Sequence, residues 1–406
     1  MIRSTGLSSS DSQQPIRDPQ ALSRLKIGMV CYPSYGGSGV VATELGIHLA
    51  DLGHEIHFIT YDKPFRLMAF HENIFFHEVD VSNYPVFKYP PYILALANKI
   101  YEVARRENLQ ILHAHYAVPH TMAVHMAAQM LGSQVRTVTT LHGTDVTIMS
   151  EDQSLRDVTE FSLNQMDALT AVSDDLKQYT LKTLNIARPI QKIYNFINAS
   201  QYSRQQALCS RSRLKVPVEE KLLIHISNFR PVKRIQDVLE IFRGVNARCP
   251  SHLMLVGDGP EMRTAYDLTD RFGLRDRVHF MGKQDNVAAL LSCSDLFLLP
   301  SEKESFGLAA LEAMACEVPV IASRTGGIPE VVEDGICGAL SEVGDTEKMI
   351  EDAVSILSDS VRYNEMASAA RIRAISLFEE KTIASQYVAL YERLLSEPRH
   401  TPASER

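Results

Sequence analysis

Two glutamates placed eight residues apart have the clearest chemical potential in this sequence. Glu304 precedes a predicted helix and Glu312 lies on it, within the segment SEKESFGLAALEAMAC. At a rise of about 1.5 Å per residue the pair spans about 12 Å. The free N–H groups at the helix start, those of Phe306, Gly307 and Leu308, and the positive end of the helix dipole suit a phosphate. Such a segment could hold a phosphate between a sugar and a ribose, each bound by one glutamate.

Taken alone, the pair has a simpler explanation: Glu304 could be an exposed residue beside a helix cap, and Glu312 a solvated residue on the helix. A basic cluster favours the ligand-binding interpretation. Arg230, Lys233 and Arg234 lie after a predicted strand, in HISNFRPVKRIQDV, where loops at the carboxyl ends of parallel strands hold ligands. Arg230 can contact a diphosphate with two parallel hydrogen bonds, and Lys233 adds a point charge. A solvated basic turn is the alternative.

Three glycine-rich turns allow close approach to the backbone. The first, Tyr35-Gly36-Gly37-Ser38-Gly39, follows the first predicted strand and precedes the first helix. It is not the dinucleotide pattern G-x-G-x-x-G, and no P-loop lysine follows it. The others are VGDGPE, at residues 256–261, and TGGIPEVV, at residues 325–332. Gly37 and Gly257 are candidates for donor contact, although each turn would also fit a purely structural role.

Histidines gather at the predicted carboxyl ends of two strands of the first half. The string HAHYAVPH contains His113, His115, Tyr116 and His120, and TTLHGTD contains His142. We expect no metal site, because strand alternation puts His113 and His115 on one face without a carboxylate or cysteine at ligand spacing. We expect His142 to donate a hydrogen bond to a sugar or phosphate instead.

The elements that must position these residues alternate between short β-branched runs and amphipathic stretches. The first series contains KIGMVCY, EIHFIT, ILHAH, VRTVTTLH and ALTAVS, and the second contains KLLIHIS, HLMLVG, RVHFMG, DLFLLP and VPVIAS. This alternation predicts an α/β fold with two doubly wound parallel sheets, the first in residues 25–195 and the second in residues 196–378. The cleft between the two domains is the expected ligand site.

The two ends of the chain are expected to lie outside these sheets. Residues 1–24 are polar and form a predicted N-terminal tail. Residues 379–406 contain a predicted helix and a tail, and the helix could either complete the second domain or cross back to the first. Residues 1–24 lack the apolar region of a signal peptide, and no stretch approaches the ~20 apolar residues of a membrane span.

Length and composition agree with a soluble two-domain protein. The 406 residues exceed the roughly 250–300 residues at which a single core stops growing. A net charge of -8 argues against a nucleic-acid partner. No C-x-x-C pair occurs, so we expect reduced thiols in a cytoplasmic protein at Cys31, Cys209, Cys249, Cys293, Cys316 and Cys337. Homo-oligomer formation is left open.

In this order, the pieces resemble the retaining glycosyltransferases of the GT-B fold, in the large family four that carries the E-x7-E motif. The resemblance extends from Lys26 to about Leu395. Strings such as CYPSYGGSGVVATELG, FKYPPY, TTLHGTD and SNFRPVKRIQDV are most similar to members that transfer N-acetylglucosamine from UDP-GlcNAc to L-malate, the first step of bacillithiol biosynthesis. The resemblance implies two Rossmann-like domains facing a central cleft, and neither a metal nor another cofactor.

The resemblance also implies roles for individual residues. Arg230 and Lys233 would hold the diphosphate, Glu312 the ribose, and Glu304 with His142 the N-acetylglucosamine ring. The amides of Phe306, Gly307 and Leu308 would complete the donor site. The acceptor malate would lie against the first glycine loop, with the candidate contacts Ser38, Tyr116, Thr140, Asn228 and Lys88.

Three other functions remain as alternatives. The same sugar transfer could use another acceptor, such as an inositol phosphate or a growing glycan. A non-hydrolysing sugar-nucleotide epimerase shares the architecture, but we can assign no acid and base set for it. A sensor with an inactive site would be expected to lack Glu304, Lys233 or Arg230, and all three are present.

Overall fold

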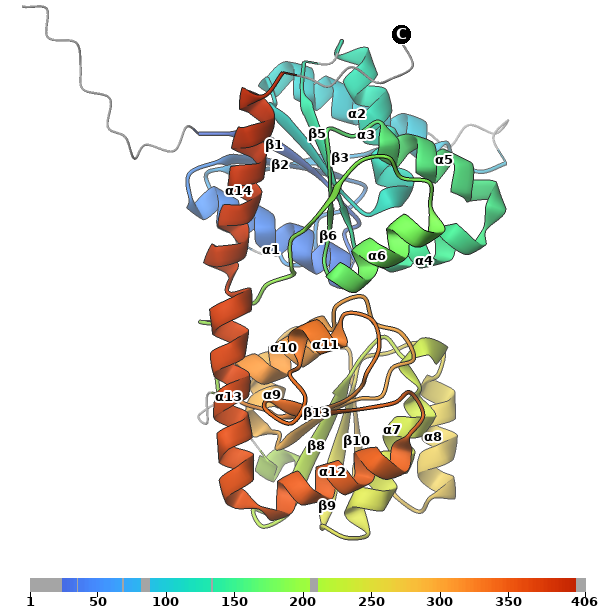
Figure 1. Cartoon of the computed structure of the whole chain (residues 1–406), viewed down its shortest axis with the longest axis vertical. Coiled ribbons are helices and arrows are strands. Elements are labelled where there is room, and N and C mark those ends of the chain that lie inside the picture. Colours follow the sequence, from blue (N-terminus) through green and yellow to red (C-terminus); the bar gives the residue numbers. More distant parts are fainter. Residues whose placement is uncertain are drawn as a thin grey trace, which may run out of the picture.

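Two parallel β-sheets, one in each half of the chain, carry the residues of interest. In this computed structural model the described residues are 24–34, 36–67, 69–81, 88–132, 134–204 and 211–398. The two halves lie one above the other in Figure 1, and in both a helix follows most of the strands; β2 and β3 are instead joined by a loop. The predicted α/β class, with two doubly wound parallel-sheet domains, is confirmed. Most of the tail expected at residues 1–24 lies outside the described residues.

The first sheet has, within the described ranges, seven strands in the order β3-β2-β1-β4-β5-β6-β7. Every adjacent pair is parallel. The strands are β1 Lys26–Val30, β2 Glu55–Thr60, β3 Ile74–Glu78, β4 Ile111–His115, β5 Arg136–Leu141, β6 Ala168–Ala171 and β7 Ile190–Lys192. The helices are α1 Gly37–Asp51, α2 Tyr92–Glu107, α3 Met122–Met130, α4 Thr144–Glu151, α5 Gln153–Asn164 and α6 Asp174–Thr183.

The second sheet repeats this plan, with six described strands in the order β10-β9-β8-β11-β12-β13. The strands are β8 Lys221–Ile226, β9 Ser251–Val256, β10 Val278–Gly282, β11 Leu296–Leu299, β12 Val320–Ser323 and β13 Gly338–Ser341. The helices are α7 Ile235–Asn246, α8 Met262–Arg271, α9 Val287–Cys293, α10 Leu308–Ala315, α11 Ile328–Val331, α12 Thr346–Ser358, α13 Ser360–Phe378 and α14 Glu380–Ser396.

Alternating strand residues build a separate core on each face of both sheets. In the first sheet, Met29 and Phe58 face a core that contains residues of α1 and α14, whereas Val30 and Ile59 face a core with α2 and α3. Because successive side chains of a strand point to opposite faces, strands buried on both faces read as nearly continuous apolar runs. This burial explains why the strands stand out in the sequence.

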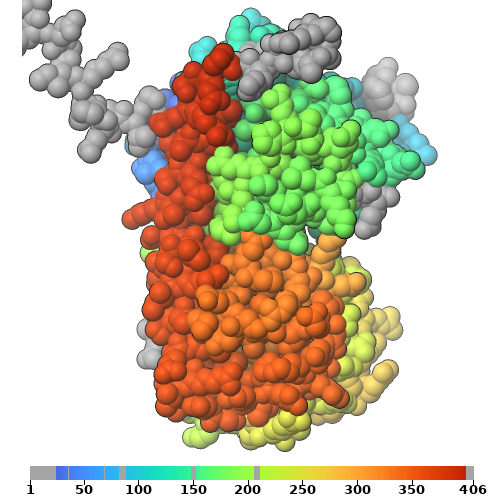
Figure 2. All heavy atoms as spheres, in the orientation of Figure 1, coloured from blue at the N-terminus to red at the C-terminus, as the bar shows by residue number. Residues whose placement is uncertain are grey.

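The last helix belongs to the core of the first domain. Helices α13 and α14 follow one another along one side of both domains, in red in Figure 1, and Figure 2 shows them flanking both halves. The two helices are separated at Glu379, whose backbone is extended. Tyr387 and Tyr391 of α14 are buried against the first sheet. The sequence left two placements open, and the structure shows that the helix crosses back to the first domain.

The chain passes between the domains at two points that lie side by side. Ile197, on the way to the second domain, donates its N–H to the carbonyl of Phe378 at 2.8 Å, and Glu380 donates its N–H to the carbonyl of Ile197 at 3.1 Å. A parallel bridge joins Ile197 and Glu379. The two passages are therefore held together by backbone hydrogen bonds.

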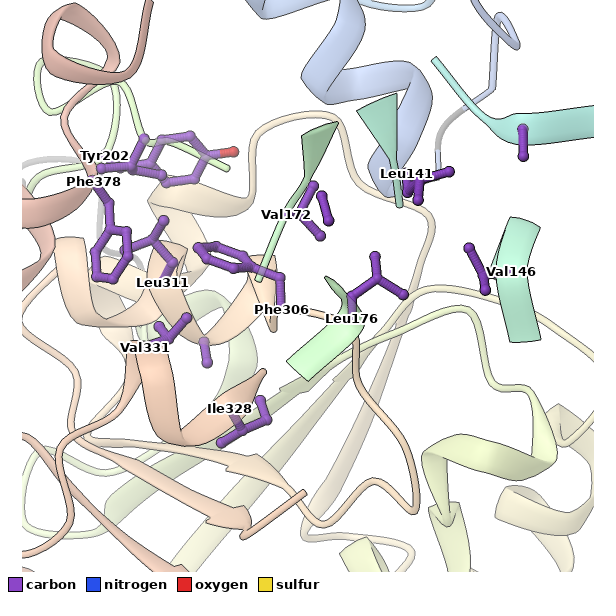
Figure 3. Close-up of a cluster of buried hydrophobic side chains, with 14 of the residues drawn as sticks. Leu141, Val146, Val172, Leu176, Tyr202, Phe306, Leu311, Ile328, Val331 and Phe378 are labelled. Carbon is purple, nitrogen blue, oxygen red and sulfur yellow. The ribbon is translucent and has the colours of Figure 1, made fainter. Parts of the chain in front are cut away.

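An apolar cluster continues across the boundary between the domains. Figure 3 shows Phe306 with Leu311 on one side and Val172 and Leu176, from the first domain, on the other. The Phe306 ring is 2% exposed. Burying such side chains on both sides of the boundary favours a close packing of the two domains. Across the described ranges, no helix is long and apolar enough to cross a bilayer.

Replacing Tyr391 with Phe should weaken the attachment of α14. The Tyr391 hydroxyl lies 2.7 Å from Nδ1 of the fully buried His113, and this ring nitrogen would lose its partner. We expect a loss of about 1–2 kcal/mol in the free energy of unfolding, measured in urea. Tyr101→Phe is the control, because the Tyr101 hydroxyl pairs with Arg105 at the surface. Equal stability of the two variants would contradict the assignment.

Candidate active site

The reversal of strand order at the centre of each sheet creates the expected place for a ligand. Strand β1 lies between β2 and β4, and β8 lies between β9 and β11. Loops that follow the two strands at such a reversal diverge to opposite faces and leave a crevice at the carboxyl edge. The basic loop follows β8 and the Glu304 segment follows β11. The two clusters predicted from the sequence therefore meet at this edge.

Lys233 and Glu304 are in direct contact. Lys233 ends a short 3-10 turn, Pro231–Lys233, and its Nζ forms an ion pair with Oε1 of Glu304. Ser301 donates its hydroxyl to the same carboxylate oxygen at 3.0 Å. The side chains of Lys233 and Glu304 are 19% and 13% exposed, so both are shielded but accessible. Their contact with a ligand stays a prediction.

The glycine turn at residues 325–332 holds the backbone of Glu304. Gly327 donates its N–H to the Glu304 carbonyl at 2.9 Å. Gly326 has a φ of +54°, and a Cβ atom there would overlap the same carbonyl oxygen. This turn therefore needs glycine in order to pack against Glu304. The close packing holds in place the segment that begins at Glu304.

Helix α10 begins in a way that leaves amides available to an anion. Its N-cap, Gly307, has a φ of +95° and supplies no side-chain cap. The first hydrogen bond of the helix runs from Leu311 N–H to the Gly307 carbonyl, so the amides of the first turn have no helical partner. Phe306 and Gly307 are buried and Leu308 is half-buried, so contact of these amides with a ligand stays a prediction. The expected site at Phe306, Gly307 and Leu308 is thus one of backbone N–H groups.

Glu312 is more enclosed than the sequence indicates. It is 8% exposed, accepts a hydrogen bond from the Tyr202 hydroxyl at 2.9 Å, and lines a small pocket between the domains. Arg66 donates to the Tyr202 oxygen at 3.0 Å and to Glu44 at 2.9 Å. Burial raises the pKa of Glu312 to about 7, although Tyr202 and Arg66 act in the opposite direction. Tyr202 and Arg66 were not identified from the sequence, because they approach from distant segments.

The first glycine loop divides into one packing glycine and one open glycine. A Cβ on Gly39 would overlap the Tyr32 carbonyl, whereas a Cβ on Gly37 would meet nothing within 4 Å. Gly37 is exposed at the start of α1, and Ser38 beside it is half-buried. Packing therefore explains Gly39 and leaves Gly37 accessible to a ligand. Tyr35 lies outside the described residues.

The loop that carries His142 packs against the Glu304 segment across the domain boundary. His142 is half-buried, and its Nε2 lies 3.1 Å from Nδ1 of His115. The next residue, Gly143, packs so closely on Ser305 that a Cβ would overlap the Ser305 hydroxyl. His142 and Glu304 thus come from adjacent positions on opposing loops. In the part of the chain that is described, no three histidine, cysteine, aspartate or glutamate side chains converge as metal ligands would.

Asp145 shapes this loop and was not singled out from the sequence. Its carboxylate is fully buried and accepts backbone N–H groups from Gly143 at 2.7 Å, Ala117 at 2.9 Å and His142 at 3.1 Å. Burial raises the pKa of Asp145 to about 6, while these hydrogen bonds lower it. The available signal was an aspartate directly after the glycine turn in TTLHGTD, where carboxylates often accept local amides.

Three of the acceptor candidates are accessible at the cleft or the surface. The Tyr116 hydroxyl lies 2.8 Å from the Thr144 hydroxyl, and burial raises its pKa while the charge of Arg230 lowers it. Arg230 is an exposed residue of the second domain, and its effect on the Tyr116 pKa therefore crosses the domain boundary. Asn228 and Lys88 are also exposed. Contact of these residues with an acceptor stays a prediction.

One of the sequence-based assignments needs correction. Thr140 was expected to contact the acceptor, but it is fully buried and its hydroxyl lies 2.7 Å from His113 Nε2 and 2.6 Å from the Thr170 hydroxyl. The N–H of Gly257, a predicted donor contact, donates to the Gly282 carbonyl at 2.8 Å. With a φ of +121°, Gly257 also packs where a Cβ would overlap the Ser227 carbonyl. Gly257 is half-buried, and its contact with the donor stays a prediction.

Comparison with known proteins agrees with this geometry. The family pattern described as Glycosyltransferase Family 4 matches residues 35–201, and that described as Glycosyl transferases group 1 matches residues 210–373. The N-acetyl-alpha-D-glucosaminyl L-malate synthase of Bacillus anthracis is 50% identical over 377 residues, which cover 93% of this chain and 99% of that protein. The chain belongs to glycosyltransferase family 4. The predicted family and enzyme class are confirmed.

Other relatives of this glycosyltransferase are more distant. The D-inositol 3-phosphate glycosyltransferase of Mycobacterium tuberculosis is 28% identical over 248 residues, 58% of this chain and 50% of that protein. A solved structure of Anabaena Alr3699/HepE with UDP and glucose has a TM-score of 0.77 at 21% identity, covering 92% of this chain and all of that one. A glycosyltransferase from Rickettsia africae also has a TM-score of 0.77 at 21% identity, over 93% of this chain and all of that one. These structures share the GT-B fold.

The buried histidines of the glycosyltransferase should make it sensitive to acid. Burial lowers the pKa of His113 and His142 to about 3, and of His120 and His225 to about 4. The unfolded chain takes up protons near pH 6.5 while these folded groups stay neutral, so stability is lost as pH falls from about 6.5 toward 4. Each such histidine contributes up to about 1.4 kcal/mol per pH unit.

Two carboxyl groups act in the opposite direction over part of this range. Burial raises the pKa of Asp145 to about 6 and of Glu312 to about 7, so their protonation in the fold partly offsets the loss. The histidines outnumber them, and we expect the melting temperature to fall progressively from pH 7 to pH 5. His225→Gln should reduce this slope. A melting temperature that is constant over that range would disprove the explanation.

Proposed function

We propose that this glycosyltransferase moves N-acetylglucosamine from UDP-GlcNAc to the hydroxyl of L-malate, with retention of the anomeric configuration, as the first step of bacillithiol biosynthesis. The observation that carries the sugar transfer is the Lys233–Glu304 pair beside the uncapped start of α10, at the reversal of strand order. The choice of substrates rests on the 50% identity to the malate synthase, which extends over 99% of that protein and includes both domains.

The charged groups of the site suit the departure of a nucleoside diphosphate. As the bond between the sugar C1 and the diphosphate oxygen breaks, negative charge grows on the leaving group. Lys233, Arg230 and the amides at the start of α10 would stabilise that charge, and preorganised groups of this kind lower a barrier most where charge develops. Glu304 would bind hydroxyls of the sugar while it holds Lys233 in place.

Among the described residues of the site we identify no protein nucleophile, so we favour transfer on one face of the sugar. The malate hydroxyl would form the new bond to C1 on the side from which the diphosphate departs. Its proton would pass to the departing phosphate oxygen, which leaves UDP and the glycoside as products. His142, next to the Gly143–Ser305 contact, would hold the ring in position. The acceptor would bind on the first-domain wall of the cleft, near Tyr116.

We also propose that the reaction needs no metal and takes place in the cytoplasm. Two basic side chains and a helix start provide the positive potential that a cation supplies in other enzymes that bind diphosphates. Cys31, Cys249, Cys316 and Cys337 are free thiols, in keeping with a reducing compartment.

Replacing Lys233 with Ala should lower turnover by about 10²-fold or more, because it removes a charge that acts mainly in the transition state. The Glu304 carboxylate would also lose its partner. Initial rates of UDP release with UDP-GlcNAc and malate measure the effect, and circular dichroism checks the fold. Lys348→Ala, at an exposed position on α12, is the control. Turnover near that of the control would rule out the role of Lys233.

A comparison of acceptors should identify the substrate. With UDP-GlcNAc as donor, we expect malate to support product formation at least roughly tenfold faster than inositol phosphates or glycan acceptors, because a site with matched polar partners rejects acceptors that leave those partners unpaired. Mass spectrometry detects the product, and the proton coupling at C1 reports its configuration. Efficient transfer to another acceptor and none to malate would favour the alternative acceptor.

A further inference from the structure

Glu330, in the second domain, binds the start of a helix in the first domain. Its Oε2 accepts the N–H of Asp174 at 2.9 Å, and its Oε1 accepts the N–H of Asp175 at 3.0 Å. These are the first two residues of α6. A carboxylate that accepts two amides at the positive end of a helix makes charge-assisted hydrogen bonds and a favourable dipole interaction.

Other first-domain groups complete the surroundings of this carboxylate. Tyr194 donates its hydroxyl to Oε2 at 3.1 Å, and Lys192 Nζ lies 3.9 Å from the same oxygen. Lys192 also pairs with Asp174 at 2.6 Å, so one cation serves both carboxylates. The Glu330 side chain is only 19% exposed. The contact is therefore better shielded than a typical surface ion pair, which contributes little.

Helix α6 does not need Glu330 as its cap. Ser173 is the N-cap, and its hydroxyl oxygen accepts the N–H of Leu176 at 3.1 Å. Glu330 occupies the two remaining amides, which water would otherwise solvate at the surface. The contact thus does little for the helix itself, and its main effect is to join the two domains.

The same contact is connected to the candidate active site from both sides. Ser173 donates its hydroxyl to the Ser305 carbonyl at 2.6 Å, directly after Glu304. On the other side, Gly327 donates to the Glu304 carbonyl, and Glu330 follows three residues later on α11. Arg373 of α13 holds that short helix by donating to the carbonyls of Val331 at 2.8 Å and Glu330 at 3.0 Å.

We propose that Glu330 is a positioning residue that clasps the first domain through α6 and so holds the Glu304 segment against the acceptor domain. This inference rests on the proposed sugar transfer for its effect on catalysis, but the clasp itself is independent of the acceptor. Without it, the two domains separate more readily and water reaches the sugar C1 beside the bound donor. Turnover to the acceptor then falls while hydrolysis of the donor rises.

The test compares Glu330→Gln with Glu333→Gln. The glutamine keeps the size of the side chain and removes the charge. Glu333 is a matched control, because it lies three residues away, its side chain is 54% exposed, and its carboxylate pairs with Arg373 of the same domain. Tyr194→Phe removes one hydrogen bond to Glu330 without changing a charge. Tyr194→Phe should change the radius of gyration and the hydrolysis ratio described below in the same direction as Glu330→Gln, by a smaller amount. It replaces Glu330→Gln as the test if that variant folds poorly.

Two measurements are made on the full chain. Small-angle scattering at saturating UDP should give a larger radius of gyration for Glu330→Gln than for the wild type and Glu333→Gln. The ratio of UDP released by hydrolysis to glycoside formed should rise roughly tenfold, in line with the loss of a charge-assisted pair. Identical radii and ratios in Glu330→Gln, Tyr194→Phe and Glu333→Gln would overturn the clasp. Changed radii without transfer to malate would instead retain the clasp and reject the proposed acceptor.

Discussion

The ion pair between Lys233 and Glu304 is the contact on which the rest of the site depends. Its two residues are separated by 71 positions in the chain and meet only because β8 and β11 are neighbours where the strand order reverses. That neighbourhood in turn requires the parallel sheet, in which successive strands are joined by crossover connections, most of them helical here. The glycines at residues 326 and 327 then fix the backbone of Glu304, and helix α10 begins four residues later in the chain.

The sequence was sufficient for the fold and for one side of the site because both depend on local patterns. Apolar runs identify ten of the thirteen described strands, whereas β3, β7 and β13, which lie at sheet edges, were not recognised. The residues after β8 and β11 must lie at the carboxyl edge wherever parallel strands are adjacent. Lys233 and Glu304 could therefore be identified without knowing any contact. The enclosure of Glu312 by Tyr202 and the path of α14 could not, since they depend on how the two domains pack.

The assignment of Thr140 to the acceptor failed for a physical reason. Thr140 lies near the end of a strand, where ligand contacts are common, but its hydroxyl is used by partners far along the chain. The sequence placed Glu312 in the donor site but could not show that Tyr202, from the connecting segment, encloses it. Glu330 acts through backbone amides of the other domain, and no residue pattern marks an amide that a distant carboxylate will reach.

The two passages between the domains restrict how the halves can move. A single covalent connection would act as a swivel and permit rotation about several axes. Here the strands at Ile197 and Glu379 run in parallel and are joined by backbone hydrogen bonds, so they define one line about which bending is easiest. Twisting would have to break those bonds. Any opening of the cleft is thereby reduced to nearly one degree of freedom, and the opposing loops return to the same register each time it closes.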